Sequence, residues 1–290
     1  MIKQIKQSEK NAKIDEFTTV NIIIERVNMN EVRKEQLNPK KVKFELFNDH
    51  FQNYKRYQLP KAQLVIADIP YNVGNNAYGS SPQWYVDGDN KNGESKLANS
   101  SFFDTDKNFN IAEYMHFCNK MLIKEPKEKG KAPAMVVFCA FEQMHMLIEY
   151  GKKYGFSNSY PIFFIKDYSP QVLKANMRII GATEQAIVLY RDKLPKFNNN
   201  GKMVFNWFHW NKCKAVEKIH PTQKPINVLK RLIEIFTDKG DVVIDPVAGS
   251  AVTLKAAVEL GRSAYGFEIK KDFYKLANER ILNSFTQSLF

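Results

Sequence analysis

The C-terminal third of the chain alternates short apolar runs with helical patterns, and this alternation limits the possible folds more than any other feature. Residues 241–244 (DVVI) predict a strand, the small-residue loop 245–251 leads into a helix that stops at Gly261, and residues 263–267 (SAYGF) predict the next strand. A strand, a helix and a second strand in this order form a βαβ unit with parallel strands. We therefore expect an α/β fold whose mixed, mostly parallel sheet carries helices on both faces.

Other apolar segments extend this pattern toward the N-terminus. Further strands are predicted at residues 44–47, 64–67, 134–141 and 186–190. One helix is expected after Pro225, with Val228, Leu229, Leu232, Ile233 and Phe236 at helical spacing, and another near the C-terminus, with Phe273, Leu276, Ala277 and Ile281 on one face. Residues 72–110 are rich in Asn, Gly and Ser and predict a mobile loop. Residues 1–40 are interpreted as an N-terminal arm to which no role is assigned.

Charge bears on the partners of the chain. Lys and Arg number 43 against 31 Asp and Glu, a formal net charge of +12. This excess suits a polyanionic partner, although it equally fits a merely soluble basic protein. The longest apolar runs are far below the roughly 20 residues that span a bilayer, and no apolar signal core follows Met1. We therefore expect a soluble, cytoplasmic protein with no membrane partner.

The cysteines and histidines predict no metal site. Cys118, Cys139 and Cys213 lie far apart, and neither they nor the five histidines show metal-ligand spacing. Because the three cysteines are odd in number, a framework of paired disulfides is excluded, and a reducing compartment fits best.

The βαβ unit has the features of a nucleotide site. Glu268 closes the second strand 23 residues after Asp245, near the spacing at which a carboxylate takes ribose hydroxyls. The glycine fingerprint of a dinucleotide site is missing, and the Asp245 carboxylate suits a cationic ligand end in place of a phosphate. Adenosine with a cationic amino-acid end describes S-adenosylmethionine. The alternative is a tight turn in which Asp245 only caps a helix.

A second chemical motif, Asp68-Ile69-Pro70-Tyr71, follows the predicted strand at 64–67. The Asp68 carboxylate and the Ile69 carbonyl could each accept one hydrogen of an exocyclic amine, while Tyr71 stacks on the base. Acceptors that hold both hydrogens favour a pyramidal nitrogen whose lone pair is free to attack. The alternative is a strand-to-turn junction with a capping Asp and a core Tyr.

Four segments occur in an order that resembles the β class of S-adenosylmethionine-dependent amino-methyltransferases of DNA. They are Asp68-Ile-Pro-Tyr71, His220-Pro-Thr-Gln-Lys-Pro225, Asp245-Pro-Val-Ala-Gly-Ser-Ala-Val-Thr253 and Gly266-Phe-Glu-Ile269. The resemblance covers about residues 44–282. It implies a Rossmann-like methyltransferase fold with circularly permuted motif order, a catalytic domain over 41–290 and a small target-recognition lobe at 191–218.

The resemblance also assigns roles to residues. Asp68, Ile69, Pro70 and Tyr71 would form the catalytic motif, with Asp49 on the cofactor adenine and Glu268 on its ribose. The cofactor site that it implies comprises Asp49, Asp68, Thr222, Gln223, Lys224, Asp245, Val247, Ala248, Gly249, Ser250 and Glu268. Ile69, Val247 and Ala251 depart from the family pattern.

The resemblance further implies site-specific transfer of a methyl group to N6 of a flipped adenine in DNA. The initial Asp of the motif favours adenine N6 over cytosine N4. Methylation of cytosine N4 or of RNA adenine, and a non-catalytic DNA-binding relative, remain the alternatives. A cognate restriction endonuclease and a homodimer are further partners that the resemblance suggests.

Segment 191–218 supplies the predicted contact with DNA. It holds seven basic and two acidic residues with interleaved aromatic ones, a composition that suits phosphates and stacked bases. The alternative is a solvated loop whose aromatic residues pack on the sheet. The residues predicted to bind DNA are Arg178, Lys202, Trp207, Trp210, Lys212 and Lys214.

Overall fold

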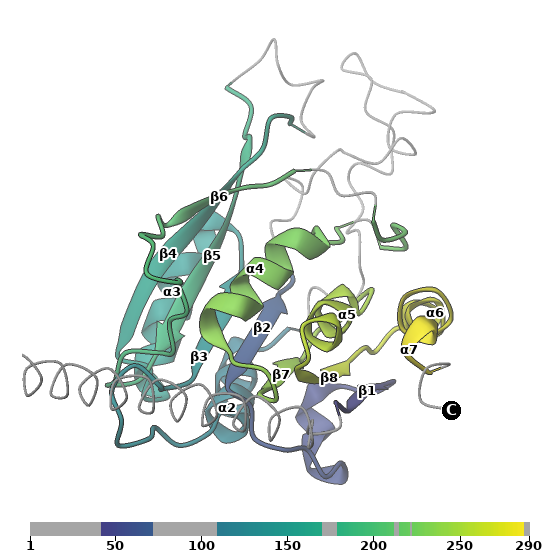
Figure 1. Ribbon diagram of the computed structural model, residues 1–290, viewed down its shortest axis with the longest axis horizontal. Coiled ribbons are helices and arrows are strands. Elements are labelled where there is room, and N and C mark those ends of the chain that lie inside the picture. Colours follow the sequence, from purple (N-terminus) through teal and green to yellow (C-terminus); the bar gives the residue numbers. More distant parts are fainter. Residues whose placement is uncertain (1–41, 72–108, 170–178, 212–214, 221, 287–290) are drawn as a thin grey trace, which may run out of the picture. The chain divides into compact units, whose positions relative to one another are not determined.

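One mixed sheet of eight strands organises the part of the chain that the structure describes (Figure 1). The computed structural model describes residues 42–71, 109–169, 179–211, 215–220 and 222–286. Its strands are β1 (Phe44–Phe47), β2 (Leu64–Asp68), β3 (Ala134–Phe138), β4 (Asn158–Ile165), β5 (Thr183–Tyr190), β6 (Trp207–His209), β7 (Val242–Asp245) and β8 (Ser263–Phe267).

The strands lie in the order β1-β8-β7-β2-β3-β5-β4-β6. Strand β5 runs antiparallel to both of its neighbours, β3 and β4. All other neighbouring pairs are parallel. The predicted mixed, mostly parallel sheet is therefore confirmed.

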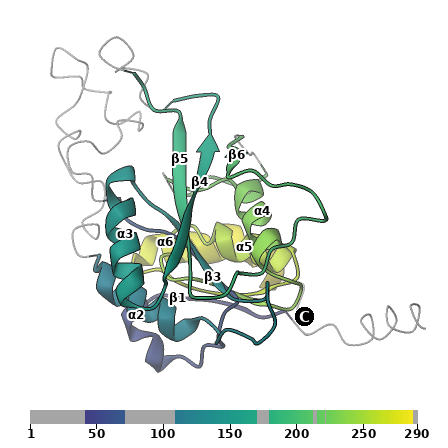
Figure 2. The same ribbon diagram turned by 90° about the vertical axis from the view of Figure 1, so that its left-hand side faces the viewer.

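Helices cover both faces of this sheet, as the sequence predicts (Figure 2). The helical elements are η1 (Phe51–Arg56), α2 (Ile111–Met121), α3 (Phe141–Lys153), α4 (Ile226–Phe236), α5 (Val252–Glu259), α6 (Lys271–Leu276), η7 (Ala277–Leu282) and α7 (Asn283–Thr286). Helices α4 and α5 lie on one side of the strands and α2 and α3 on the other. The predicted C-terminal helix is divided, because η7 is a π-helical turn between α6 and α7.

Each face of the sheet has its own apolar core. Leu64 and Ile66 of β2 join the core under α4 and α5, whereas Val65 and Ala67 join the core under α2 and η1. Successive side chains of a strand point to opposite faces. A strand covered on both faces therefore reads as a continuous apolar run, as β2 does.

Strand β3 ends three residues earlier than predicted. Residues 134–141 predict one strand, but β3 stops at Phe138 and Phe141 opens α3. The side chain of Gln143 accepts a hydrogen bond from the backbone amide of Ala140 at 3.0 Å, which fixes the first turn of α3. Apolarity alone does not separate the end of a buried strand from the start of the next helix.

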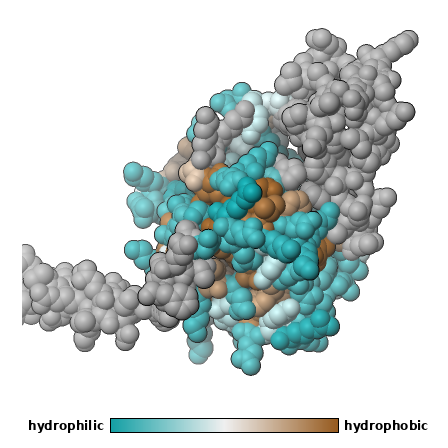
Figure 3. Space-filling view, turned by 90° about the vertical axis from the view of Figure 1, so that its right-hand side faces the viewer, coloured by the Kyte–Doolittle hydropathy of each residue, from teal (hydrophilic) through white to brown (hydrophobic). Residues whose placement is uncertain are grey.

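The surface on the side of α6 and α7 mixes hydrophilic side chains with smaller apolar areas (Figure 3). Such a mixture is ordinary, because folded proteins keep much apolar surface in contact with water. None of the helices in the described ranges combines the length and the apolar character that crossing a membrane requires. The predicted N-terminal arm, nearly all of the 72–110 loop, and Arg178, Lys212 and Lys214 lie outside the described residues.

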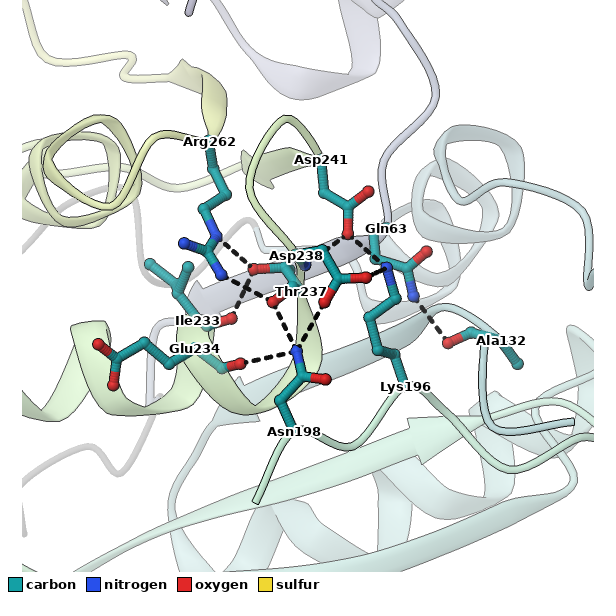
Figure 4. A network of polar contacts seen from close by, with 10 residues as sticks. All are labelled: Gln63, Ala132, Lys196, Asn198, Ile233, Glu234, Thr237, Asp238, Asp241 and Arg262. Atoms are coloured by element: carbon teal, nitrogen blue, oxygen red, sulfur yellow. Dashed lines mark hydrogen bonds and ion pairs between the residues drawn. The ribbon is translucent and has the colours of Figure 1, made fainter. Parts of the chain in front are cut away.

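A buried polar network fixes the start of the 191–218 segment (Figure 4). The ammonium of Lys196 lies 2.7 Å from a carboxylate oxygen of Asp238 and 2.7 Å from one of Asp241. The side-chain amide of Asn198 donates to the carbonyl of Thr237 at 2.9 Å. Arg262 donates to that same carbonyl at 2.8 Å. These contacts tie residues 196–198 to the turn between α4 and β7.

We expect Lys196→Met to destabilise the fold by about 2 kcal/mol. Removing one member of a buried ion pair costs roughly 3–5 kcal/mol, and the cost falls here because the side chain of Asp238 is 48% exposed. Chemical denaturation measures the change in unfolding free energy. Lys202→Met, at an exposed position of the same segment, is the control and should leave that energy unchanged. Equal stability of the two variants would contradict the assignment.

Candidate active site

Four carboxylates gather along one edge of the sheet. Asp49 follows β1, Glu268 follows β8, Asp245 ends β7 and Asp68 ends β2. These four strands are consecutive neighbours and parallel. Their carboxyl ends therefore share one edge, the position where open α/β sheets bind ligands.

Asp68 has one engaged and one unengaged oxygen. Its Oδ2 lies 2.5 Å from Nζ of Lys224. Its Oδ1 is buried and has no hydrogen-bond partner among the described residues. Burial raises the pKa of Asp68, and the Lys224 ammonium works against that rise. A buried acceptor without a partner is costly, so Oδ1 is available to a donor from a ligand.

The rest of the motif is held by its neighbours. The amide of Ile69, which is buried, donates to the carbonyl of Phe138 at 3.2 Å. The carbonyl of Pro70 accepts from the side chain of Gln143 at 2.7 Å. The hydroxyl of Tyr71 donates to Oε2 of Glu184 at 3.0 Å. The motif therefore has fixed partners on β3, α3 and β5.

Lys224 lies among aromatic rings as well as beside Asp68. Its ammonium is 5.4 Å from the ring centre of Phe138, 5.5 Å from that of Tyr71 and 5.8 Å from that of Trp210. Such distances allow cation–π attraction. Trp210 departs from the prediction of a DNA-facing surface residue, because it is only 5% exposed and forms part of this enclosure.

Asp245 opens the loop after β7 and is buried. Its Oδ1 accepts from the amide of Val247 at 3.1 Å. Burial raises the pKa of Asp245 to about 7, and the nearby carboxylates of Asp68 and Glu268 add to the rise. A buried carboxylate with other carboxylates near it is stabilised by a cation.

The same loop packs on β8 through its backbone. The amide of Ala248 donates to the carbonyl of Phe267 at 2.8 Å, and the amide of Gly249 donates to Oε2 of Glu268 at 2.9 Å. Gly266 makes this contact possible, because a Cβ there would lie 3.0 Å from Cβ of Ala248 and 2.8 Å from Cδ1 of Leu254. Ser250 is buried in the same loop.

Ala251 has a left-handed backbone with φ of 57°. The motif pattern of the resembling family has Gly at this position. For a residue with a side chain this conformation costs about 1–2 kcal/mol. The methyl group of Ala251 is fully buried, which stabilises the fold by about 0.8 kcal/mol. Burial of the Ala251 methyl group therefore offsets part of the cost of its left-handed backbone.

We expect Ala251→Gly to be close to neutral for stability, because relief of the strain offsets the lost methyl group. Ala257→Gly is the matched control, since Ala257 is equally buried but lies inside α5. There the lost methyl and the lower helix propensity of Gly add to about 2 kcal/mol. Denaturation of both variants measures the difference, and equal destabilisation would exclude strain at Ala251.

Three predicted cofactor residues have their polar groups engaged within the protein. Oδ2 of Asp49 accepts from the Tyr57 hydroxyl at 2.8 Å, and Oδ1 accepts from Asn53 at 2.6 Å. The side chain of Gln223 donates to the carbonyl of Glu217 at 2.9 Å and accepts from the amide of Ile219 at 3.2 Å. Exposed Thr222 contacts Nδ1 of His220. Of the described residues in 222–224, Lys224 is the one whose ammonium pairs with the Asp68 carboxylate.

The basic residues of 191–218 have mixed roles. The guanidinium of Arg191 donates to the carbonyls of Ile123 and Asn119, and Lys193 donates to the carbonyl of Pro126 at 2.7 Å. Together with Lys196, these residues anchor the segment to the domain. Lys202 is exposed, and Trp207 is 41% exposed with its ring stacked on Phe205. Among the residues that the structure describes, Lys202 and Trp207 thus remain candidates for contact with DNA.

Two site residues, Glu184 and Lys166, have no counterpart in the sequence prediction. Lys166 lies 2.5 Å from Oε1 of Glu184, and its ammonium is 4.9 Å from the ring centre of Trp210. Glu184 stands near the amino end of β5, which reaches the edge of the sheet that carries Asp68 because β5 runs antiparallel to β3. No local motif marks them, so only the direction of strand pairing could have revealed them.

The site suits a ligand with positive charge. Asp68, Asp245 and Glu268 place carboxylates at this edge, and the pKa of each is raised by burial. Gly249, whose amide donates to Glu268, has a positive φ of 51°, a conformation that glycine adopts without strain. S-adenosylmethionine carries a sulfonium and an ammonium group, so these residues fit it.

Comparison with known proteins identifies relatives over most of the chain. A family model described as DNA methylase, of the N6/N4 type, matches residues 62–279. A DNA adenine methyltransferase of Escherichia coli, YhdJ, is 24% identical over 264 residues, 81% of this chain and 81% of that protein. The type II methyltransferase M.HpaI of Haemophilus parainfluenzae is 24% identical over 243 residues, 77% of this chain and 68% of that protein.

Solved structures share the fold. The complex of M1.HpyAVI with S-adenosylmethionine covers 81% of this chain and 98% of its own, with a TM-score of 0.58 and 18% identity. The cytosine-N4-specific PvuII DNA methyltransferase covers 84% and 90%, with a TM-score of 0.61 and 14% identity. At these identities the likeness establishes the methyltransferase fold.

Proposed function

Because the chain belongs to the N6/N4 family of DNA methylases, we propose that it methylates the exocyclic N6 of a flipped adenine in DNA. Membership of this family makes it an S-adenosylmethionine-dependent DNA methyltransferase. The choice of adenine over cytosine is the finer assignment that we add. The catalytic domain would comprise residues 41–290, with 191–218 contributing to target recognition.

One observation carries the proposal. Oδ1 of Asp68 is a buried acceptor with no hydrogen-bond partner among the described residues, and Tyr71 lies in the same motif. An exocyclic amine on a planar base would satisfy Oδ1 with one of its hydrogens. The ring of Tyr71 would stack on the base, a contact worth about 1–3 kcal/mol. The site therefore lacks the type of donor that the proposed substrate provides.

The protein residues then have separable tasks. Asp68 orients the amine and is placed to accept a proton from it as its nitrogen gains positive charge. Asp245 and Glu268 hold the cofactor through its ammonium group and its ribose, respectively. S-adenosylmethionine, when bound, supplies an electrophilic methyl group. Flipping a paired base into the site costs a few kcal/mol, which contacts to the displaced base offset.

The initial Asp of the motif supports adenine as the target base. YhdJ, which is named a DNA adenine methyltransferase, is similar to the chain over 81% of its length. The PvuII enzyme, which shares the fold, is named cytosine-N4-specific, so cytosine N4 is the second candidate. A cytoplasmic location, a cognate endonuclease and a homodimer remain predictions.

Product analysis tests the proposal. The purified protein is incubated with mixed-sequence DNA, or with RNA, and methyl-labelled S-adenosylmethionine, and the nucleic acid is then digested to nucleosides. We expect the label in N6-methyladenine from DNA. Label in N4-methylcytosine would keep the reaction and overturn the assignment of the base. DNA binding without any label would favour a non-catalytic relative.

A further inference from the structure

Glu184 links the aromatic and the acidic parts of the catalytic motif, although it belongs to neither. Its Oε2 accepts from the hydroxyl of Tyr71 at 3.0 Å, and its Oε1 lies 2.5 Å from Nζ of Lys166. Its side chain is only 15% exposed. Both oxygens are therefore engaged, and the carboxylate has little freedom to turn.

Lys224 connects Glu184 electrostatically to Asp68. Its ammonium pairs with Oδ2 of Asp68 at 2.5 Å and lies beside the Tyr71 ring. Burial would raise the pKa of Glu184, but the Lys224 and Lys166 ammonium groups outweigh it and lower that pKa. Glu184 is therefore ionised, and the charges of two carboxylates and two ammonium groups balance in this buried network.

We propose that Glu184 is a positioning residue for methyl transfer, which holds the Tyr71 ring and balances the charge of Lys224 beside Asp68. This inference rests on the proposed function. Burial and the carboxylates of Asp68 and Glu184 raise the pKa of Tyr71, so its hydroxyl stays protonated and donates to Glu184. A ring held at its hydroxyl end keeps one orientation for stacking on a base. A balanced Lys224 leaves the second oxygen of Asp68 to the substrate amine.

The position of Glu184 in the sheet explains how one residue can both hold the Tyr71 ring and balance the charge of Lys224. It pairs with Phe164 across the β4–β5 ladder, and Phe138 pairs with Ala186 two residues further along β5. Asp68 in turn pairs with Phe138. Glu184 therefore stands two strands away from Asp68 at the same edge, on rigid strands that preserve the geometry.

A double-mutant cycle tests the assignment. Glu184→Gln keeps the size but removes the charge, and its single amide oxygen would turn toward the Lys166 ammonium, so that the Tyr71 hydroxyl loses its acceptor. Tyr71→Phe keeps the ring but removes the donor. We expect Glu184→Gln to lower the single-turnover methylation rate on the order of 10²-fold, as small misplacements at reacting centres do. The dissociation constant of S-adenosylmethionine should stay unchanged. The double variant should be no slower than Glu184→Gln alone, because the two residues act together.

Glu149→Gln is the control, since Glu149 pairs with Lys152 on the exposed surface of α3. Multiplicative effects of the two single changes would overturn the assignment. So would a Glu184→Gln variant as active as Glu149→Gln, or one that loses cofactor affinity and thermal stability in step with the rate. Absence of methylation by the wild-type protein would count against the proposed function, whereas an active wild type with independent variants counts against Glu184 alone.

Discussion

Asp68→Asn should lower the rate of methyl transfer on the order of 10³-fold, the loss expected when an acceptor at a reacting centre is removed. The amide can place its N–H₂ group where the carboxylate offers an acceptor, so it meets the substrate amine donor to donor. It also lacks the charge that would stabilise a cationic nitrogen. The unpartnered Oδ1 is the atom at which this change acts.

Cofactor binding separates this effect from unfolding. Asp245 and Glu268 keep their contacts in the variant, so the affinity for S-adenosylmethionine should fall far less than the rate. Loss of Asp68 leaves Lys224 without its nearest carboxylate, and circular dichroism should verify that the variant is folded. Asp272→Asn, at an exposed position in the first turn of α6, is the matched control. A folded Asp68→Asn variant with the rate of this control would exclude the proposed role.

Local patterns predicted the parallel core of the fold well. Continuous apolar runs marked β2 and β7, and the small-residue loop before α5 marked the carboxyl-end site. These signals are local, because burial on both faces and the close approach of backbone to ligand each restrict residue types over a few positions. Asp68, Asp245 and Glu268 lie together at the predicted edge for this reason.

The antiparallel part of the sheet was harder to predict. Strand β4 contains polar and exposed residues, and β6 has only three residues, so neither presents a continuous apolar run. Because β5 reverses direction, Glu184 reaches the edge that carries Asp68 from the start of a strand and not from its end. Composition also overstated the basic surface, since Lys196 serves a buried network within the domain. Whether a Lys meets phosphate or a carboxylate of the same domain depends on tertiary contacts.

The affinity for S-adenosylmethionine should rise with pH and level off above about 7. Burial raises the pKa of Asp245 to about 7 in the protein. Below that pH the carboxyl is protonated, and its proton must leave before the carboxylate can hold the cofactor ammonium. The dissociation constant should therefore increase as the pH falls through 7, reaching about tenfold for each pH unit below pH 6. Since half of the Asp245 carboxyl groups are protonated at pH 7, the expected loss of affinity between pH 7 and pH 5 is about 50-fold.

The ionisable groups near Asp245 also determine how the affinity for S-adenosylmethionine changes with pH. The pKa of His220, which lies against Gly249, is lowered by burial to about 4, so this ring stays neutral between pH 5 and pH 8. Asp68 and Glu268 also have raised pKa values and would steepen the loss at the acid end. Calorimetric titration across this range, compared with Asp245→Asn, isolates the contribution of Asp245. The variant should bind weakly, with little change between pH 6 and pH 8, because it has no carboxyl to ionise there. A wild-type affinity equally flat over that interval would show that Asp245 does not hold the cationic end of the cofactor.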